Sequence, residues 1–173
     1  MRIPLVRIPD FAEDSTNTLN QHMSDTQAAL ADRAYGNLYQ DNASTLISIA
    51  SSGVNYIVTG FTACPHLRGL SSSGTSAMTC NNPGLYYITW NLSFKAQSNN
   101  QGIEGSIGIN QVRQSEGAAH IVPTTANQEL EIAGSGCLRM ARNDYIHLFV
   151  KNHDGTGDVT VEHANLTIVK IDD

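Results

Sequence analysis

Histidines, cysteines and paired acids are the residues of this chain that could carry chemistry, and none forms a recognisable catalytic pattern. The sequence holds no G-x-S-x-G turn and no caspase-like or papain-like cysteine signature. Phosphate-binding loops of the G-x-x-x-x-G-K-[ST] and G-x-G-x-x-G types are also absent. The paired acids Glu129 and Glu131 share the exposed face of an expected strand, which fits a solvated edge. We therefore expect no enzymatic activity and no cofactor.

Residues that could ligate a metal are present, but their spacing fits other roles. His147 and His163 fall in the last two expected strands, and Glu162 adjoins His163. In a threefold assembly a histidine near the axis is repeated three times and could hold a metal or an anion. The alternative is an interface or core histidine. The run from Asp154 to Asp158 departs from the calcium-loop pattern and fits a hairpin turn, so we expect no bound metal.

The cysteines do not suggest a disulfide framework or a zinc site. Cys64, Cys80 and Cys137 are an odd number and form no C-x-x-C pair. Cys64 and His66 offer two ligands, with no second pair at zinc spacing. We expect all three cysteines to be free in a protein made in a reducing cytosol, and a Cys64–Cys80 bridge is the alternative.

The polarity of the chain comes from neutral residues. The 173 residues include 10 Lys and Arg against 16 Asp and Glu, for a net charge of −6, and only 15% are charged. Asn, Ser and Thr together number 44, a quarter of the chain. Binding nucleic acid requires clustered positive charge, so we expect no nucleic-acid partner. Few charges among many Thr, Ile, Asn, Ser and Gly residues favour a β-rich shell.

We also expect no membrane segment and no signal peptide. The first nine residues contain two prolines and two arginines, which interrupt any apolar stretch of the signal-peptide kind. No apolar run approaches the roughly 18 residues of a membrane helix. These observations favour synthesis in the cytosol.

The first eleven residues are expected to form an extended arm. Pro4 and Pro9 exclude a helix, and the apolar residues cannot form a core by themselves. Such an arm gains stability by lying in a groove or at the sheet edge of a partner. Its candidate docking residues are Arg2, Ile3, Leu5, Val6, Arg7, Ile8 and Phe11.

A helix is predicted from about Asn17 to about Arg33. Acidic and N-cap residue types precede it, and Leu19, Met23 and Leu30 recur at a heptad-like spacing. The narrow apolar seam fits a short bundle between subunits. The alternative is a helix that packs on its own domain.

From Tyr35 onward, the pattern predicts about nine short strands with no helical period between them, which indicates an antiparallel sandwich or barrel. Cys64 to Thr75 is expected to be a long loop, and Asn81-Asn82-Pro83-Gly84 a tight turn. The expected strands are Tyr35–Gln40, Thr45–Ala50, Asn55–Phe61, Leu85–Lys95, Gly102–Val112, Ala118–Pro123, Glu129–Ala141, Tyr145–Asn152 and Val159–Ile171. In the strand after the turn, every even-numbered residue from Tyr86 to Phe94 is apolar and should face the core.

The run from Pro83 to Ser93 resembles the superfamily of complement globular heads and tumour necrosis factors (TNF). Gly84 and Tyr86 match its Gly-x-Tyr strand opening, with Ile88 in place of the next aromatic. Arg142 to Leu148 is similar to the Gly-Asp-x-Val strand opening of the family, and Asn165 to Val169 to its closing strand. The resemblance implies an all-β antiparallel jelly roll of ten strands that assembles as a compact trimer.

A trimer needs a contact surface. Tyr87, Tyr145, His147 and Phe149 have the parity opposite to the core and would leave an exposed apolar patch on a monomer. Burying these four residues around a threefold axis would remove the patch, so they are the predicted trimer interface.

Arm, helix and jelly roll together look like a bacteriophage head-decoration or head-fibre protein. By this analogy, residues 1–33 are the docking arm and helix, and residues 34–173 are the displayed jelly roll. The expected function is a homotrimeric structural protein of the virion. It would lie on the capsid surface and bind the major capsid protein or another virion protein. The alternative is a phage receptor-binding or tail-associated adhesin module with the same fold, and the sequence identifies no host-surface glycan.

Overall fold

The structure is a computed structural model that describes residues 17–25 and 33–173. The chain divides between Arg33 and Ala34 into two units, which are described separately. Within the described residues, no helix is long and apolar enough to cross a membrane. The candidate docking residues from Arg2 to Phe11 and the seam residue Leu30 lie outside the described residues.

Residues 17–25 form a helix, which is the first part of the predicted one. Gln21 Nε2 donates to Asp25 Oδ1 at 2.8 Å, a contact between residues one turn apart. The seam residues Leu19 and Met23 are both exposed. The helix bundle between subunits stays a prediction.

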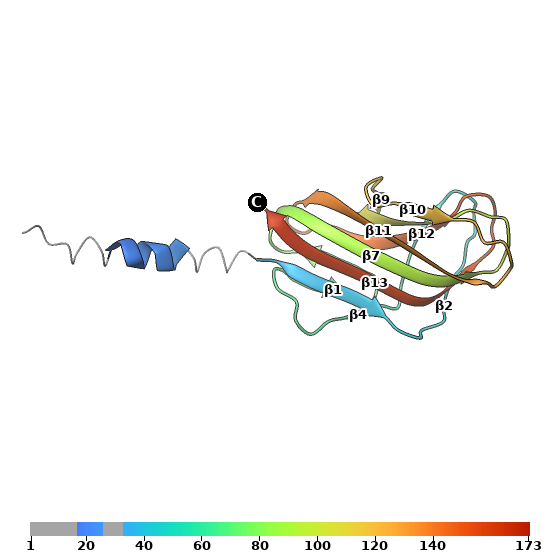
Figure 1. Ribbon diagram of the computed structural model, residues 1–173, viewed down its shortest axis with the longest axis horizontal. Coiled ribbons are helices and arrows are strands. Elements are labelled where there is room, and N and C mark those ends of the chain that lie inside the picture. Colours follow the sequence, from blue (N-terminus) through green and yellow to red (C-terminus); the bar gives the residue numbers. More distant parts are fainter. Residues whose placement is uncertain (1–16, 26–32) are drawn as a thin grey trace, which may run out of the picture. The chain divides into compact units, whose positions relative to one another are not determined.

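Within residues 34–173, thirteen strands form two antiparallel sheets that pack face to face (Figure 1). The first sheet has the order β11-β7-β13-β1-β4, and β2 also pairs with β13. Its strands are β1 (Tyr35–Gln40), β2 (Thr45–Ile47), β4 (Thr62–Ala63), β7 (Gly84–Ala96), β11 (Glu129–Met140) and β13 (Val159–Asp172).

The second sheet has the order β10-β8-β12-β6-β5, with β3 paired to β12 and β9 paired to β8. Its strands are β3 (Asn55–Ile57), β5 (Leu70–Ser73), β6 (Ala77–Cys80), β8 (Ile103–Ile109), β9 (Val112–Arg113), β10 (Ala119–Ile121) and β12 (Tyr145–Asn152). The all-β antiparallel sandwich predicted from the sequence is confirmed.

The core lies between the sheets and follows the predicted alternation. The even-numbered apolar residues of β7 point into it, and none is more than 2% exposed: Tyr86, Ile88, Trp90, Leu92 and Phe94. Ile107 and Leu148 of the second sheet and Leu166 of the neighbouring strand β13 are also fully buried. Burying these side chains supplies most of the driving force for folding, at roughly 1.5–3 kcal/mol for each large apolar group.

The segment from Cys64 to Thr75 is not the loop that the sequence predicts. Leu70–Ser73 forms β5, which pairs with Ala77–Cys80 of β6. The prediction was wrong because β5 lies at the edge of the second sheet, where a serine run can supply backbone hydrogen bonds without burying apolar side chains.

The two ends of the sandwich differ. Ala34 lies beside β13, where its carbonyl oxygen accepts a hydrogen bond from Lys170 N at 2.8 Å, so residues 1–33 join the domain at this end. The opposite end, named here the loop end, is formed by residues 97–102, 122–128 and 153–158 (Figure 1). Backbone hydrogen bonds from Gln97 N to Asp158 O and from Asn100 N to Pro123 O join these loops.

Candidate functional site: an uncharged sheet face

The outward face of the first sheet carries three rows of residues without a formal charge. Strand register places one residue each from β11, β7, β13 and β1 in every row. The rows are Cys137, Tyr87, Val169 and Tyr35; Ser135, Thr89, Thr167 and Asn37; and Ala133, Asn91, Asn165 and Tyr39. We call these twelve residues the uncharged face.

Charged residues flank the uncharged face at both ends. Toward the loop end, Lys95 Nζ lies 3.0 Å from Glu162 Oε1, and His163 Nδ1 lies 3.0 Å from Asp41 Oδ1. The hydrogen bond from Lys95 is the largest of several effects that lower the pKa of Glu162. At the other end, Arg139 donates to the carbonyl oxygen of Asp173 at 2.8 Å. Charged residues therefore border the three rows of the uncharged face at both ends.

Hydrogen bonds between side chains hold the centre of the uncharged face in place. Asn37 Nδ2 donates to Asn165 Oδ1 at 2.6 Å and to Thr167 Oγ1 at 2.9 Å. Thr167 in turn donates to Asn165 Oδ1 at 2.9 Å. These bonds pair Asn37 Nδ2, Asn165 Oδ1 and Thr167 Oγ1 with one another, which lowers the cost of burying these three atoms against a partner.

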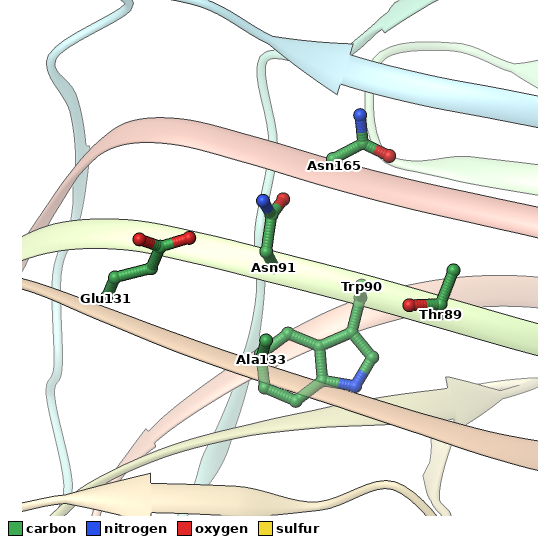
Figure 2. A pocket seen from close by; sticks show the side chains of 6 residues that line it. All are labelled: Thr89, Trp90, Asn91, Glu131, Ala133 and Asn165. Carbon is green, nitrogen blue, oxygen red and sulfur yellow. The ribbon is translucent and has the colours of Figure 1, made fainter.

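A shallow hollow of about 300 Å³ lies on the uncharged face. It is lined by Thr89, Trp90, Asn91, Glu131, Ala133 and Asn165. Figure 2 shows Asn91 and Asn165 on neighbouring strands, with Ala133 and Glu131 on β11 beside them. The small side chain of Ala133 leaves this space between its longer neighbours, and Trp90 is fixed by its indole N–H, which donates to Gly117 O at 2.9 Å.

The four residues predicted to form the trimer interface do not share a face. Tyr87 lies on the uncharged face and is 42% exposed. Tyr145, His147 and Phe149 lie on β12 of the second sheet, where Tyr145 is 43% exposed. His147 and Phe149 are buried within a single chain. Of the four residues, only Tyr87 therefore lies on the candidate surface, and the trimer interface itself stays a prediction.

Phe149 is buried because β8 carries a glycine beside it. A Cβ atom at Gly108 would lie 2.0 Å from the ring of Phe149, so the ring occupies the space that a side chain would fill. His147 stacks on Phe149 with ring centroids 6.1 Å apart. Burial lowers the pKa of His147, although a contact of 3.3 Å with the Ser76 carbonyl oxygen opposes this shift. Parity alone could not reveal this packing.

The other sequence candidates do not assemble into a site. His147 and His163 lie on different sheets, and the described residues contain no group of three or more His, Cys, Asp or Glu side chains able to hold a metal. Cys64, Cys80 and Cys137 are all free, so the alternative Cys64–Cys80 bridge is not formed.

Known proteins resemble the chain in fold alone. No family model and no curated protein sequence matches it. Among solved structures, the Eiger TNF of S. frugiperda superposes with a TM-score of 0.60 at 13% identity, covering 82% of this chain and 94% of that one. Murine APRIL superposes with a TM-score of 0.55 at 14% identity, covering 80% of this chain and 99% of that one. The domain is a TNF-like jelly roll.

Sequence identities this low do not allow a ligand or partner of these two proteins to be assigned to this chain. The fold predicted from the short Gly84-x-Tyr86 match is nevertheless confirmed over the whole sandwich. The uncharged face was missed at the sequence level because its rows join four strands that are distant in the chain. Asn, Ser and Thr at the odd positions of β7 were its one visible signal.

Proposed function

We propose that the chain is a non-enzymatic structural protein that forms a homotrimer through the uncharged face. The observation that carries this proposal is the absence of formal charge across twelve outward positions on four adjacent strands. Four large side chains of this face are each at least 40% exposed: Tyr35, Tyr39, Tyr87 and Val169. Exposed apolar groups that lie together in this way are typical of an interaction surface.

A second copy of the same chain is the occupant that this surface fits best. The face combines tyrosines with uncharged Asn and Thr groups, of which Asn37, Asn165 and Thr167 are hydrogen-bonded to one another, so a surface of similar chemistry on another copy can cover it without leaving a charge unpaired. The charged ends would remain at the rim, where solvent screens them. Three copies, the number that the sequence resemblance implies, close around an axis and leave no open edge.

Two exposed tyrosines offer a matched test of this interface. Tyr87→Asp would place three mutually repelling carboxylates in the buried seam, so sedimentation equilibrium should show dissociation to the 18.7 kDa monomer. Tyr145→Asp is the control, because Tyr145 is equally exposed but lies on the second sheet. A Tyr87→Asp protein that remains trimeric, or a Tyr145→Asp protein that dissociates, would overturn the assignment.

Within this proposal, the trimer is a capsid decoration or head-fibre protein of a bacteriophage and docks through its first eleven residues. Support comes from the division of the chain between Arg33 and Ala34, since residues 34–173 form a compact unit by themselves, and from the two arginines and two prolines among the apolar residues of the arm. Three arms presented together would raise the apparent affinity by roughly 10²-fold or more through effective concentration.

The docking step is tested with purified particles that lack this protein. Deletion of residues 1–11 should leave a folded trimer that no longer binds such particles, whereas the full chain does. A truncated protein that decorates particles as well as the full chain would place docking on the jelly roll. A trimer that binds host cells but no particle would favour the alternative, a receptor-binding or tail-associated adhesin.

A further inference from the structure

A buried carboxylate lies among cations on the outward face of the second sheet. Glu104 of β8 is only 6% exposed. Its Oε1 accepts from Arg113 Nε at 2.5 Å, and its Oε2 contacts Lys151 Nζ at 3.1 Å and His153 Nε2 at 3.0 Å. The ring of His120, opposite Glu104 in the register, lies 6.2 Å from that of His153. We call these five residues the Glu104 cluster.

The Glu104 cluster carries more positive than negative charge. Burial raises the pKa of Glu104, but hydrogen bonds and charges from Arg113 and Lys151 outweigh it and bring the pKa down to about 2. One ionised carboxylate thus faces two permanent cations and two histidines. The neighbouring carboxylate of Asp154 accepts the backbone N–H of Gly102 at 2.8 Å. A positive excess is notable in a chain whose net charge is −6.

Several polar groups of this region have no partner in the described part of the chain. Arg113 uses only Nε in its side-chain contacts, so its two terminal amino groups make no hydrogen bond to a described residue. Ser106 occupies the next outward position on β8, and its Oγ is buried without a hydrogen-bond partner. Buried polar atoms without partners are rare in folded proteins.

We propose that the Glu104 cluster binds an oxyanion group, such as a sulfate, phosphate or carboxylate, through the terminal amino groups of Arg113 and the rings of His120 and His153. The planar guanidinium fork matches two oxygens of such a group. Glu104 is a positioning residue, because it holds the cations side by side without touching the ligand.

The site is accessible in the proposed trimer. Arg113 and His153 retain 30% and 39% exposure of their side chains, and His120 is exposed. The cluster lies at the start of β8 and the end of β12, near the loop end and away from Ala34 (Figure 1). It is on the second sheet, so association through the uncharged face of the first sheet leaves it open.

Titration of the full chain tests this site. Isothermal titration calorimetry with sodium sulfate and sodium phosphate, against sodium chloride at equal ionic strength, should show one saturable site per chain. Arg113→Gln should weaken binding roughly tenfold or more, the typical loss for a hydrogen bond to a charged group. Arg142→Gln, which removes an exposed arginine from the turn before β12, should bind as the unchanged protein does.

A second variant covers the case in which Arg113→Gln disturbs the fold. His120 makes no side-chain hydrogen bond to a described residue, so His120→Gln should keep the fold and still weaken binding. Titration with a sulfated oligosaccharide and with its desulfated counterpart distinguishes two sources of the oxyanion group, a saccharide and a small free ion. Tighter binding of the sulfated chain than of free sulfate indicates a saccharide ligand, whereas equal affinity indicates a small free anion. Absence of saturable binding, or equal binding by the Arg113, His120 and Arg142 variants, would overturn the proposal.

Discussion

A single glycine decides where an aromatic ring of β12 is placed. Phe149 lies over Gly108, and a methyl group at position 108 would approach three atoms of the ring within 2.8 Å. Gly108→Ala should therefore destabilise the domain by about 2 kcal/mol through overpacking, measured by urea denaturation. In a Phe149→Leu background the cost of the same change should fall, because the smaller side chain leaves room. Equal costs in both backgrounds would show that the ring is not the cause.

The buried histidine beside this ring gives the stability of the domain a pH dependence. Burial holds the pKa of His147 below its usual 6.5, so below that pH the unfolded chain binds a proton that the folded domain does not. The free energy of unfolding should fall as the pH drops below about 6.5 and should recover above it.

Thermal melts across this pH range test the role of His147. His147→Gln should flatten the loss of stability below about pH 6.5. His163→Gln, at an exposed histidine on the charged edge of the first sheet, is the control and should leave the loss in place. If His147→Gln loses stability with pH as steeply as the unchanged chain, another group is responsible.

At the level of elements, the sequence predicts strands well where one face is buried. From Ile88 to Ala96 in β7, apolar residues alternate with polar ones, so the parity and core face of the strand follow from period two alone. The serine-rich β5 and the two-residue β9 lack this alternation, since they lie at sheet edges and bury little. Their pairing depends on the neighbouring strand, which local sequence does not specify.

The candidate face required information that only the strand register provides. Tyr87 and Tyr145 look equivalent in sequence, since each is an aromatic residue of non-core parity. Topology assigns them to different sheets, and of the two residues that were expected to join them, both are buried and Phe149 fills the space beside Gly108. The candidate face could not be predicted from the sequence because it depends on the pairing of strands that are distant in the chain.

We expect the helix and the jelly roll to contribute separately to the proposed assembly. The core residues all lie in Ala34–Asp173, so removal of residues 1–33 should leave a folded β domain with a similar melting temperature, measured by circular dichroism. The shortened protein should also remain a trimer in analytical ultracentrifugation, because the uncharged face is intact. Dissociation on removal of residues 1–33 would instead assign trimer formation to the seam of Leu19, Met23 and Leu30.

For the whole molecule, the number of chains that associate determines whether the uncharged face is exposed to water. An isolated jelly roll with this composition would expose Tyr35, Tyr39, Tyr87 and Val169 on one neutral face, and closing that face around an axis removes it from water. The Glu104 cluster and the loop end would then be repeated three times. Repetition would let weak contacts with a multivalent partner combine.

Sedimentation equilibrium of the full chain measures this number directly. A homotrimer of the 18.7 kDa chain should give one species of about 56 kDa that persists on dilution through the micromolar range. A concentration-independent mass of 18.7 kDa, or the mass of a dimer, would contradict the proposed homotrimer.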